Sequence, residues 1–147
     1  MMTIIAVGKQ EYCKKEFELY LKRLRNYSDV KFIEVREEKD RNPEIVRRKE
    51  GEKILAKAEG HVAVLDASGQ QFSSEEFAGF LKRKKEENKK ISFVVGGAFG
   101  LSKDVLDRAD AKISLSRMTL QHDICRIFLL EQIYRAFTIM NKGKYHK

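Results

Sequence analysis

The sequence predicts one α/β domain over residues 1–147, arranged in three layers around a mainly parallel β-sheet. The chain has 147 residues, which is the size of a single domain. Strand-like and helix-like apolar patterns alternate along it, and this alternation is typical of a sheet covered by helices. Residues 91–95 are almost wholly apolar, as expected for a central strand that is buried on both faces.

Two strands and two helices are predicted in the first half of the chain. Residues 3–7 and 30–35 form the strands, and the second alternates apolar and polar side chains. Residues 11–24 repeat apolar side chains at helical spacing among charges, which predicts an amphipathic helix. A second helix is predicted over 43–57, opened by a proline and capped by Asn42. Its inward positions are expected to be Ile45, Ile54 and Leu55.

The second half continues the alternation. Strands are predicted at 61–65, 91–95 and 111–115, and a polar turn over 66–69 follows the first of these three. The helices between and after them have clear starting signals.

Ser73 and Glu76 have the spacing of a capping box, so a helix is expected to begin there. The glycines of 96–100 turn the chain into a short helix opened by Ser102, and 123–140 forms a long terminal helix.

The carboxyl ends of the strands are the predicted ligand site, because open α/β sheets bind ligands outside that edge. Three loops are expected to meet there: the loop after Leu65, the glycine loop 96–100 and the loop 116–121. Glycines let the backbone approach a ligand closely. Their spacing matches neither a P-loop nor a dinucleotide fingerprint, so a purely structural turn is the alternative.

The terminal helix is apolar on nearly all sides. Between residues 124 and 140 the polar side chains are Arg126, Glu131, Gln132, Arg135 and Thr138. A helix of this kind is buried on two sides. We expect a second copy of the chain to cover the second side, and the alternative is a deep core helix in a monomer.

Charge favours a nucleic-acid partner. The formal net charge is +8 and the isoelectric point is about 9.5, which suits neutralisation of phosphates, although ordinary solubility charge is the alternative. The last residues, 142–147, are basic and include Tyr145, which can stack on a base. A frayed, solvated tail is the other interpretation.

The sequence argues against several classes of protein. No apolar run approaches the roughly 18 residues of a membrane span, and the start of the chain lacks a secretory layout, so a cytoplasmic protein is expected. Cys13 and Cys125 are far apart and form no CxxC pair, which argues against a disulfide scaffold. His122 has no partner at metal-ligand spacing, so no metal site is predicted.

Seven short stretches occur in the order of one family. They are VGK at 7–9, KEGE at 49–52, VLDASG at 64–69, FVVGGAFGL at 93–101, LSRMTL at 115–120, LEQIYRAF at 130–137 and YHK at 145–147. With them, the chain resembles the ribosomal RNA large subunit methyltransferase H (RlmH) family of the SPOUT superfamily over nearly its full length.

The resemblance implies an S-adenosylmethionine-dependent methyltransferase that methylates N3 of a pseudouridine in large-subunit (23S) ribosomal RNA, within the ribosome. It also implies a cytoplasmic homodimer whose carboxyl-terminal half forms a trefoil knot. The knot comes from the resemblance alone, since true knots are nearly absent from protein folds in general.

The resemblance also implies site residues. The cofactor-binding positions are Leu65, Gly96, Gly97, Leu115, Ser116, Arg117, Met118, Thr119 and Leu120. The catalytic or substrate-side candidates are Arg135 for phosphate or carbonyl contact, Tyr145 for stacking and His146 for proton handling or base contact.

The chain departs from the family pattern at one position, and two other functions are alternatives to the one that the resemblance implies. The family usually has a proline before His122, where this chain has Gln121, so the end of the loop is expected to be freer here. A catalytically silent RNA-binding α/β-knot protein is the alternative function. A nucleotide-dependent oxidoreductase is a further one, against which the missing GxGxxG fingerprint argues.

Overall fold

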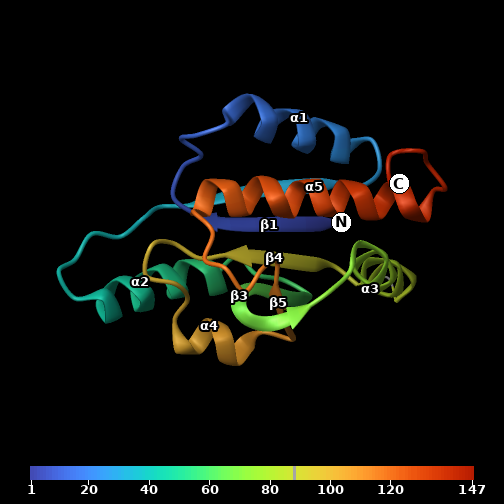
Figure 1. Ribbon diagram of the computed structural model, residues 1–147. Helices are drawn as coiled ribbons and strands as arrows, with labels where there is room; N and C mark the ends of the chain where they lie inside the picture. The colour runs from blue at the N-terminus through green and yellow to red at the C-terminus, as the bar shows by residue number, and fades with distance from the viewer. Residues whose placement is uncertain (88) are drawn as a thin grey trace.

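Five parallel strands form one sheet in the order β2-β1-β4-β3-β5 in the computed structural model, which describes residues 1–87 and 89–147 (Figure 1). This confirms the predicted α/β class with a mainly parallel sheet. The strands are β1 Met2–Val7, β2 Val30–Val35, β3 His61–Gln71, β4 Ile91–Val95 and β5 Ala111–Ser114. The helices are α1 Lys14–Arg25, α2 Pro43–Leu55, α3 Ser74–Glu86, α4 Lys103–Arg108 and α5 His122–Met140.

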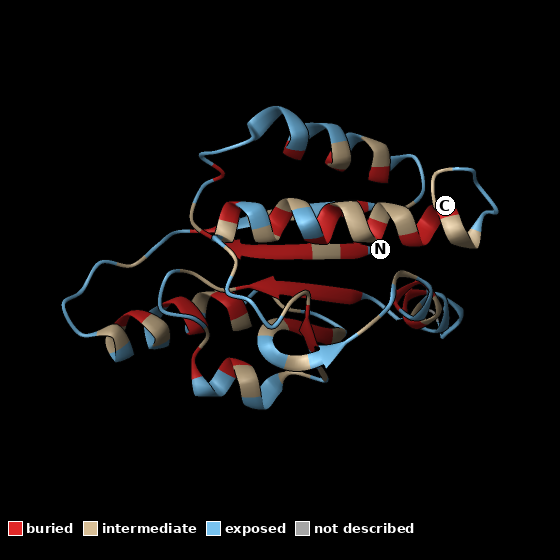
Figure 2. Cartoon of the chain, in the orientation of Figure 1, coloured by how far each residue is buried: buried red, intermediate tan, exposed pale blue. Residues whose placement is uncertain are grey.

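Helices cover both faces of the sheet, with α1, α3 and α5 on one face and α2 and α4 on the other (Figure 1). Successive side chains of a strand point to opposite faces. Ile4 and Phe93 therefore pack in the cluster under α1, α3 and α5, whereas Ile5 and Val94 pack under α2 and α4. Every residue of β4 is buried, and Figure 2 shows β1 and β4 buried along most of their length.

The predicted helix starts are present. Asn42 caps α2 by accepting the Glu44 N–H at 3.0 Å. Ser73 and Glu76 form the full capping box at α3, with hydrogen bonds of 3.1 and 2.7 Å. Ser102 caps α4. Each cap satisfies amide groups that a helix terminus otherwise leaves unpaired.

Helix α1 begins at Lys14, three residues later than predicted. Cys13 adopts a left-handed conformation with φ of 52°, which interrupts the helix. The amides of Glu11 and Tyr12 instead donate to the carboxylate of Asp123, at 3.0 and 2.9 Å. This tertiary contact overrides the local helical pattern of residues 11–13.

The inward face of α2 differs from the prediction by one position. Ile54 is buried as expected and Leu55 is half-buried against the same cluster. Ile45 is only half-buried, and its neighbour Val46 takes the buried place. The helix begins at Pro43, and this start sets which of two adjacent apolar residues faces the sheet.

The predicted polar turn over 66–69 is wrong, because strand β3 continues to Gln71. The strand contains an irregularity instead: Leu65 and Gln70 both lie opposite Ile113 of β5. A Cβ added to Gly69 would lie 2.6 Å from the backbone of Lys112, so glycine allows this close approach. The polar residues 66–69 therefore belong to a bulge within β3 and do not mark its end.

Helix α5 is sandwiched within its own chain, since it packs against α1 and α3 as well as the sheet. Phe137 is buried, and it stacks on Tyr27 beyond the end of α1. Ile124 and Phe128 remain exposed, at 43% and 37%. The second apolar side is thus covered partly by the same chain, as in the alternative interpretation of a core helix. Neither α5 nor another helix of the described residues has the length and apolarity to span a membrane.

The trefoil knot implied by the resemblance stays a prediction. The strand order places β4 between β1 and β3, with β5 at the far edge.

Two glycines give opposite predictions for stability. A Cβ at Gly51 of α2 would lie 2.2 Å from the Oγ of Ser102, the cap of α4. Gly51→Ala should therefore lower the free energy of unfolding by about 1–3 kcal/mol through overpacking. Gly79→Ala in α3 is the matched control, because its Cβ would meet only Arg83 at 3.6 Å. The free energy of unfolding of Gly79→Ala should rise by about 0.5–1 kcal/mol, because alanine has a higher helix propensity than glycine. Urea denaturation measures both, and equal effects would contradict the packing of α2 on α4.

Candidate functional site

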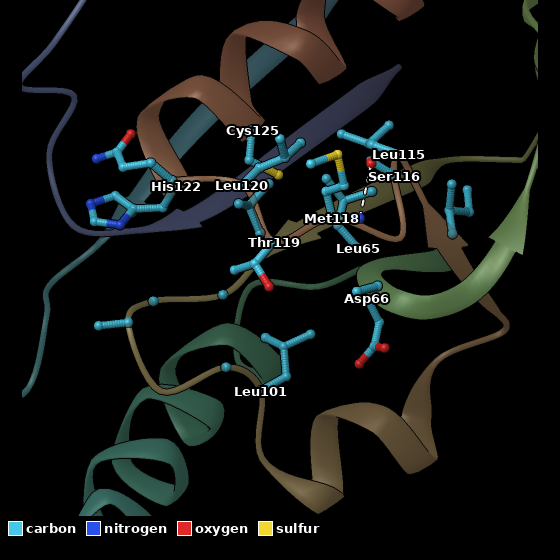
Figure 3. Close-up of a pocket in the computed structure, with 18 residues that line it drawn as sticks. Leu65, Asp66, Leu101, Leu115, Ser116, Met118, Thr119, Leu120, His122 and Cys125 are labelled. Atoms are coloured by element: carbon cyan, nitrogen blue, oxygen red, sulfur yellow. Dashed lines mark hydrogen bonds between the residues drawn. The ribbon is translucent and has the colours of Figure 1, made fainter.

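A pocket of about 440 Å³ lies at the carboxyl-terminal edge of the sheet, where the three predicted loops meet. Figure 3 shows side chains from β3, from the loop after β4 and from the loop before α5 converging on it. This volume lies in the range of small-molecule sites. The convergence predicted from the sequence is therefore present in the structure.

Eight of the nine predicted cofactor positions line this pocket. They are Leu65, Gly96, Gly97, Leu115, Ser116, Met118, Thr119 and Leu120. Arg117 is not among the lining residues and is exposed. Asp66 and Gln121 also line it, and both lie in loops that the sequence placed at the site. Sequence reasoning missed Leu101, His122 and Cys125, because Leu101 follows the predicted glycine loop and the other two lie at the start of α5.

The walls are mainly apolar and carry little charge. Among the described residues that line the pocket there is no lysine or arginine, and Asp66 is the one acid. The amide and hydroxyl of Ser68 donate to Asp66 at 2.8 and 2.5 Å. These hydrogen bonds lower the pKa of Asp66, so it stays a carboxylate at neutral pH. The pocket therefore offers hydrogen-bond acceptors and apolar surface, with a negative group beside them.

The glycine loop has two kinds of glycine. A Cβ at Gly96 would lie 3.0 Å from Leu101 and 3.2 Å from the backbone of Gly100, so its space is filled by the loop itself. Gly100 has a φ of +79° and nothing within 4 Å of an added Cβ. Gly96 thus shapes the loop, and Gly100 supplies its left-handed turn.

Helix α2 supports this loop from below. Arg47 donates to the carbonyl of Phe99 at 3.4 Å, and the carboxylate of Glu50 lies 3.2 Å from the place of a Cβ on Gly97. Glu50 is 3% exposed and accepts the Glu38 amide at 3.1 Å. Burial raises the pKa of Glu50 above its ordinary value. The buried carboxyl therefore holds the loop after β2 and lies close beside Gly97 of the glycine loop.

Gln121 fixes the end of the third loop. Its side-chain oxygen accepts the amides of Asp123 and Ile124, at 2.8 and 3.1 Å, and so caps α5. The expectation of a freer loop end stays a prediction. The glutamine anchors the helix start through hydrogen bonds.

A buried ion pair attaches α5 to β1. Arg126 is fully buried and donates to the carbonyl of Val7, and its NH1 lies 3.6 Å from Asp123 Oδ1. Burial alone would raise the pKa of Asp123, but the amides of Glu11 and Tyr12 and the charge of Arg126 lower it overall. Nothing in the sequence pattern distinguished Arg126 from the other polar positions of the helix.

Nucleophilic thiol and metal chemistry have no support here. Burial raises the pKa of Cys125 to about 11, so the thiol stays protonated at neutral pH. Within residues 1–87 and 89–147, no group of three histidine, cysteine, aspartate or glutamate side chains has the arrangement of a metal site.

The three substrate-side candidates lie together along the second half of α5. Tyr145 donates to Glu131 at 3.0 Å, and the Arg135 guanidinium lies 4.7 Å from the centre of the Tyr145 ring. His146 lies 3.3 Å from Arg135 and 2.8 Å from Glu75. The tail is thus docked on α5 and α3 rather than frayed. None of the three lines the pocket of the same chain.

Comparisons with known proteins give one family. A family model described as a predicted SPOUT methyltransferase matches residues 1–146. The ribosomal RNA large subunit methyltransferase H of Carboxydothermus hydrogenoformans is 46% identical, and the alignment covers 99% of both chains. The ribosomal RNA large subunit methyltransferase H of Caldicellulosiruptor saccharolyticus is 45% identical, and the alignment covers 100% of both chains. A solved structure, a probable methylase family protein from Haemophilus influenzae, has a TM-score of 0.60 at 14% identity, covering 99% of this chain and 70% of that one. This last likeness concerns the fold alone.

The raised pKa of Glu50 predicts a pH-dependent stability difference. Its protonated form fits the folded protein better than its carboxylate, so its stabilising contribution is complete below the unfolded pKa, near 4.5, and is lost as pH rises through the folded pKa. Glu50→Gln removes this titration but keeps an acceptor for the Glu38 amide. The free energy of unfolding of the variant, relative to wild type, should therefore increase as the pH rises from about 4 to 7. Urea denaturation at several pH values measures it.

Glu52→Gln is the control, because Glu52 lies on the exposed face of the same helix. A difference for Glu50→Gln that is constant with pH would show that burial does not perturb this carboxyl.

Proposed function

The chain belongs to the ribosomal RNA large subunit methyltransferase H family of SPOUT methyltransferases, and from this we propose that it methylates N3 of a pseudouridine in large-subunit (23S) ribosomal RNA, with S-adenosylmethionine as methyl donor. The names of its relatives support the ribosomal RNA substrate. The observation that carries the choice of donor is the composition of the pocket.

The pocket suits a ligand without phosphates. ATP and NAD carry phosphate groups, which proteins commonly bind with lysine, arginine or a glycine-rich helix start. The glycines of 96–100 have the spacing of neither a P-loop nor a dinucleotide fingerprint. Among the described residues that line this pocket there is no lysine or arginine, and Asp66 is an anion. A cationic sulfonium compound with an adenine base fits the apolar walls, the loop backbone and one carboxylate. When bound, S-adenosylmethionine supplies an electrophilic methyl group that needs little further activation.

The protein's own task is then to align the substrate and remove a proton. Holding the reacting atoms in near-attack geometry supplies much of the rate of such a transfer. The N3 proton of the pseudouridine must also leave, so a proton acceptor is required. We assign this side of the site to the tail, with His146 for the proton or the base, Tyr145 for stacking and Arg135 for phosphate or carbonyl contact.

The placement of these groups supports the proposal of a homodimer. The tail folds back onto α5, where Tyr145 meets Glu131 roughly 9 Å along the helix from Cys125, and it does not line the pocket of the same chain. We propose that a second copy brings its tail to this pocket. Met118, Ile124 and Phe128 support this, because they are exposed apolar side chains at and near the pocket. We also propose that the dimer acts on ribosomes in the cytoplasm.

A space-filling variant tests the pocket. Thr119 is an exposed residue of the pocket wall, so Thr119→Trp should fill the cavity without disturbing the core. We expect affinity for S-adenosylmethionine to fall by tens-fold or more, which is about 2 kcal/mol or more. Arg117→Ala, which changes a neighbour outside the pocket, should stay within about twofold. Calorimetry with S-adenosylmethionine, ATP and NAD measures both variants, and tighter binding of a nucleotide phosphate would refute the choice of donor.

Truncation after Asn141 tests the tail. Folding and S-adenosylmethionine affinity should be nearly unchanged, because the removed residues do not line the pocket. Transfer of a labelled methyl group to free RNA, large subunits and assembled ribosomes should be abolished. His146→Ala should lower turnover by about 10²–10⁴ if the imidazole handles the proton. An effect on apparent substrate affinity alone would restrict His146 to RNA contact.

Wild-type transfer by the truncated protein would remove the tail from the site. A wild-type protein that binds S-adenosylmethionine and RNA but transfers no methyl group would instead support the catalytically silent alternative.

A further inference from the structure

Basic side chains gather at the amino-terminal edge of the sheet, opposite to the pocket. Helix α1 runs back antiparallel to the strands and ends at this edge, and α3 lies across the strands at the same edge (Figure 1). The last turn of α1 carries Lys22, Arg23 and Arg25, and that of α3 carries Arg83, Lys84 and Lys85. Figure 1 shows the chain amino terminus, α3 and the end of α5 on this same side. Charges that are dispersed along the sequence therefore converge in space.

A small cavity of about 100 Å³ joins the end of α3 to the segment after α1, and Ser28 lines it together with Lys84, Lys85 and Lys89. Phe137 lines it as well, and Tyr27 stacks on Phe137 with ring centres 5.9 Å apart and planes inclined by 18°. Tyr27 is 38% exposed. A partly exposed aromatic ring thus lies beside a cavity that three lysines line.

Nearby acids neutralise only part of this charge. Glu87 pairs with Lys84 at 3.3 Å and with Lys89 at 2.8 Å. Arg25, Arg83 and Lys85 have no acidic partner within 4 Å among the described residues. Exposed pairs of this kind contribute little to stability.

Helix dipoles favour basic residues in last turns, but they do not account for the whole surface. Lys89 lies between α3 and β4, and Lys142 and Lys144 follow the end of α5, so all three lie outside the helices. The open tyrosine is also unexplained by helix electrostatics. Free cations around an exposed aromatic ring are the chemistry that binds unpaired nucleic acid.

We propose that this basic edge, defined by Arg25, Tyr27, Arg83, Lys84, Lys85 and Lys89, is an RNA-docking surface separate from the methyl-transfer pocket. It rests on the proposed function in taking ribosomal RNA as the partner. The cations contact phosphates of a single-stranded segment, and Tyr27 stacks on one of its bases. Because the basic edge and the pocket lie at opposite ends of the sheet, an RNA bound here is held at a second point.

Charge reversal tests the electrostatic part. The variant Arg83→Glu/Lys85→Glu is compared with Lys14→Glu/Lys49→Glu, whose residues are exposed in the first turn of α1 and in α2. The probe is a fluorescein-labelled single-stranded RNA, titrated by anisotropy at several salt concentrations. The first variant should bind at least about tenfold more weakly at low salt. The slope of log affinity against log salt should become shallower by about 0.7 for each phosphate that the variant no longer neutralises. The control should change much less.

Tyr27→Leu separates stacking from charge. It should weaken binding by about 5-fold to 150-fold while leaving the salt slope unchanged, because no charge is removed. Urea denaturation and S-adenosylmethionine calorimetry verify that each variant is folded with an intact pocket.

If both double variants lose RNA affinity equally, the loss comes from the change in net charge and not from this surface, and the inference is overturned. Wild-type RNA affinity in Arg83→Glu/Lys85→Glu would overturn it as well, leaving the basic edge to helix electrostatics or an acidic protein partner. The two proposals fail separately. If ribosomes are methylated but the edge variants bind RNA normally, this inference alone is wrong. If the edge binds RNA and no methyl group is transferred, the proposed function alone is wrong.

Discussion

The parallel direction of all five strands determines how this molecule is organised. The loops after β4 and β5 and the bulge of β3 meet at the carboxyl-terminal edge of the sheet, and α1 and α5 run back to the other edge (Figure 1). Residues far apart in sequence, such as Leu65, Gly96 and Leu115, therefore share one pocket wall. At the opposite edge, Lys84 and Lys85 at the end of α3 lie beside Ser28, which follows α1. The position of the pocket is a consequence of strand direction.

Within that arrangement, buried polar groups hold the pocket in shape. Asp123 accepts two amides from the loop after β1, and Arg126 reaches the carbonyl of Val7 in the same strand. A buried ion pair contributes little net stability compared with apolar packing, but removing one partner is strongly destabilising. Its value here is geometric, because it fixes where α5 begins and hence where the loop before it lies. Glu50 of α2 holds the loop after β2 through the Glu38 amide and lies beside Gly97.

Local patterns were sufficient for most of the fold. Apolar periodicity located the five strands, and the caps at Asn42, Ser73 and Ser102 followed from local hydrogen-bonding chemistry. The predictions were wrong where contacts between residues far apart in sequence determine the local structure. The start of α1 is set by Asp123, and the course of β3 beyond Leu65 is set by its pairing with β5. The loops of the candidate site could be predicted because the carboxyl edge is a topological property. Glu50 and Arg126 could not, since only tertiary packing shows that these charges are buried.

The distribution of charge separates two recognition tasks on one small domain. The pocket is lined by apolar groups and one carboxylate, and this environment favours a cationic ligand over a polyanion. The opposite edge concentrates cations beside an exposed tyrosine, and that environment favours a polyanion with unpaired bases. No cation lines the described walls of the pocket in a single chain. Under the proposed function, the cavity is therefore left to the methyl donor, while the basic edge and the partner's tail contact the RNA.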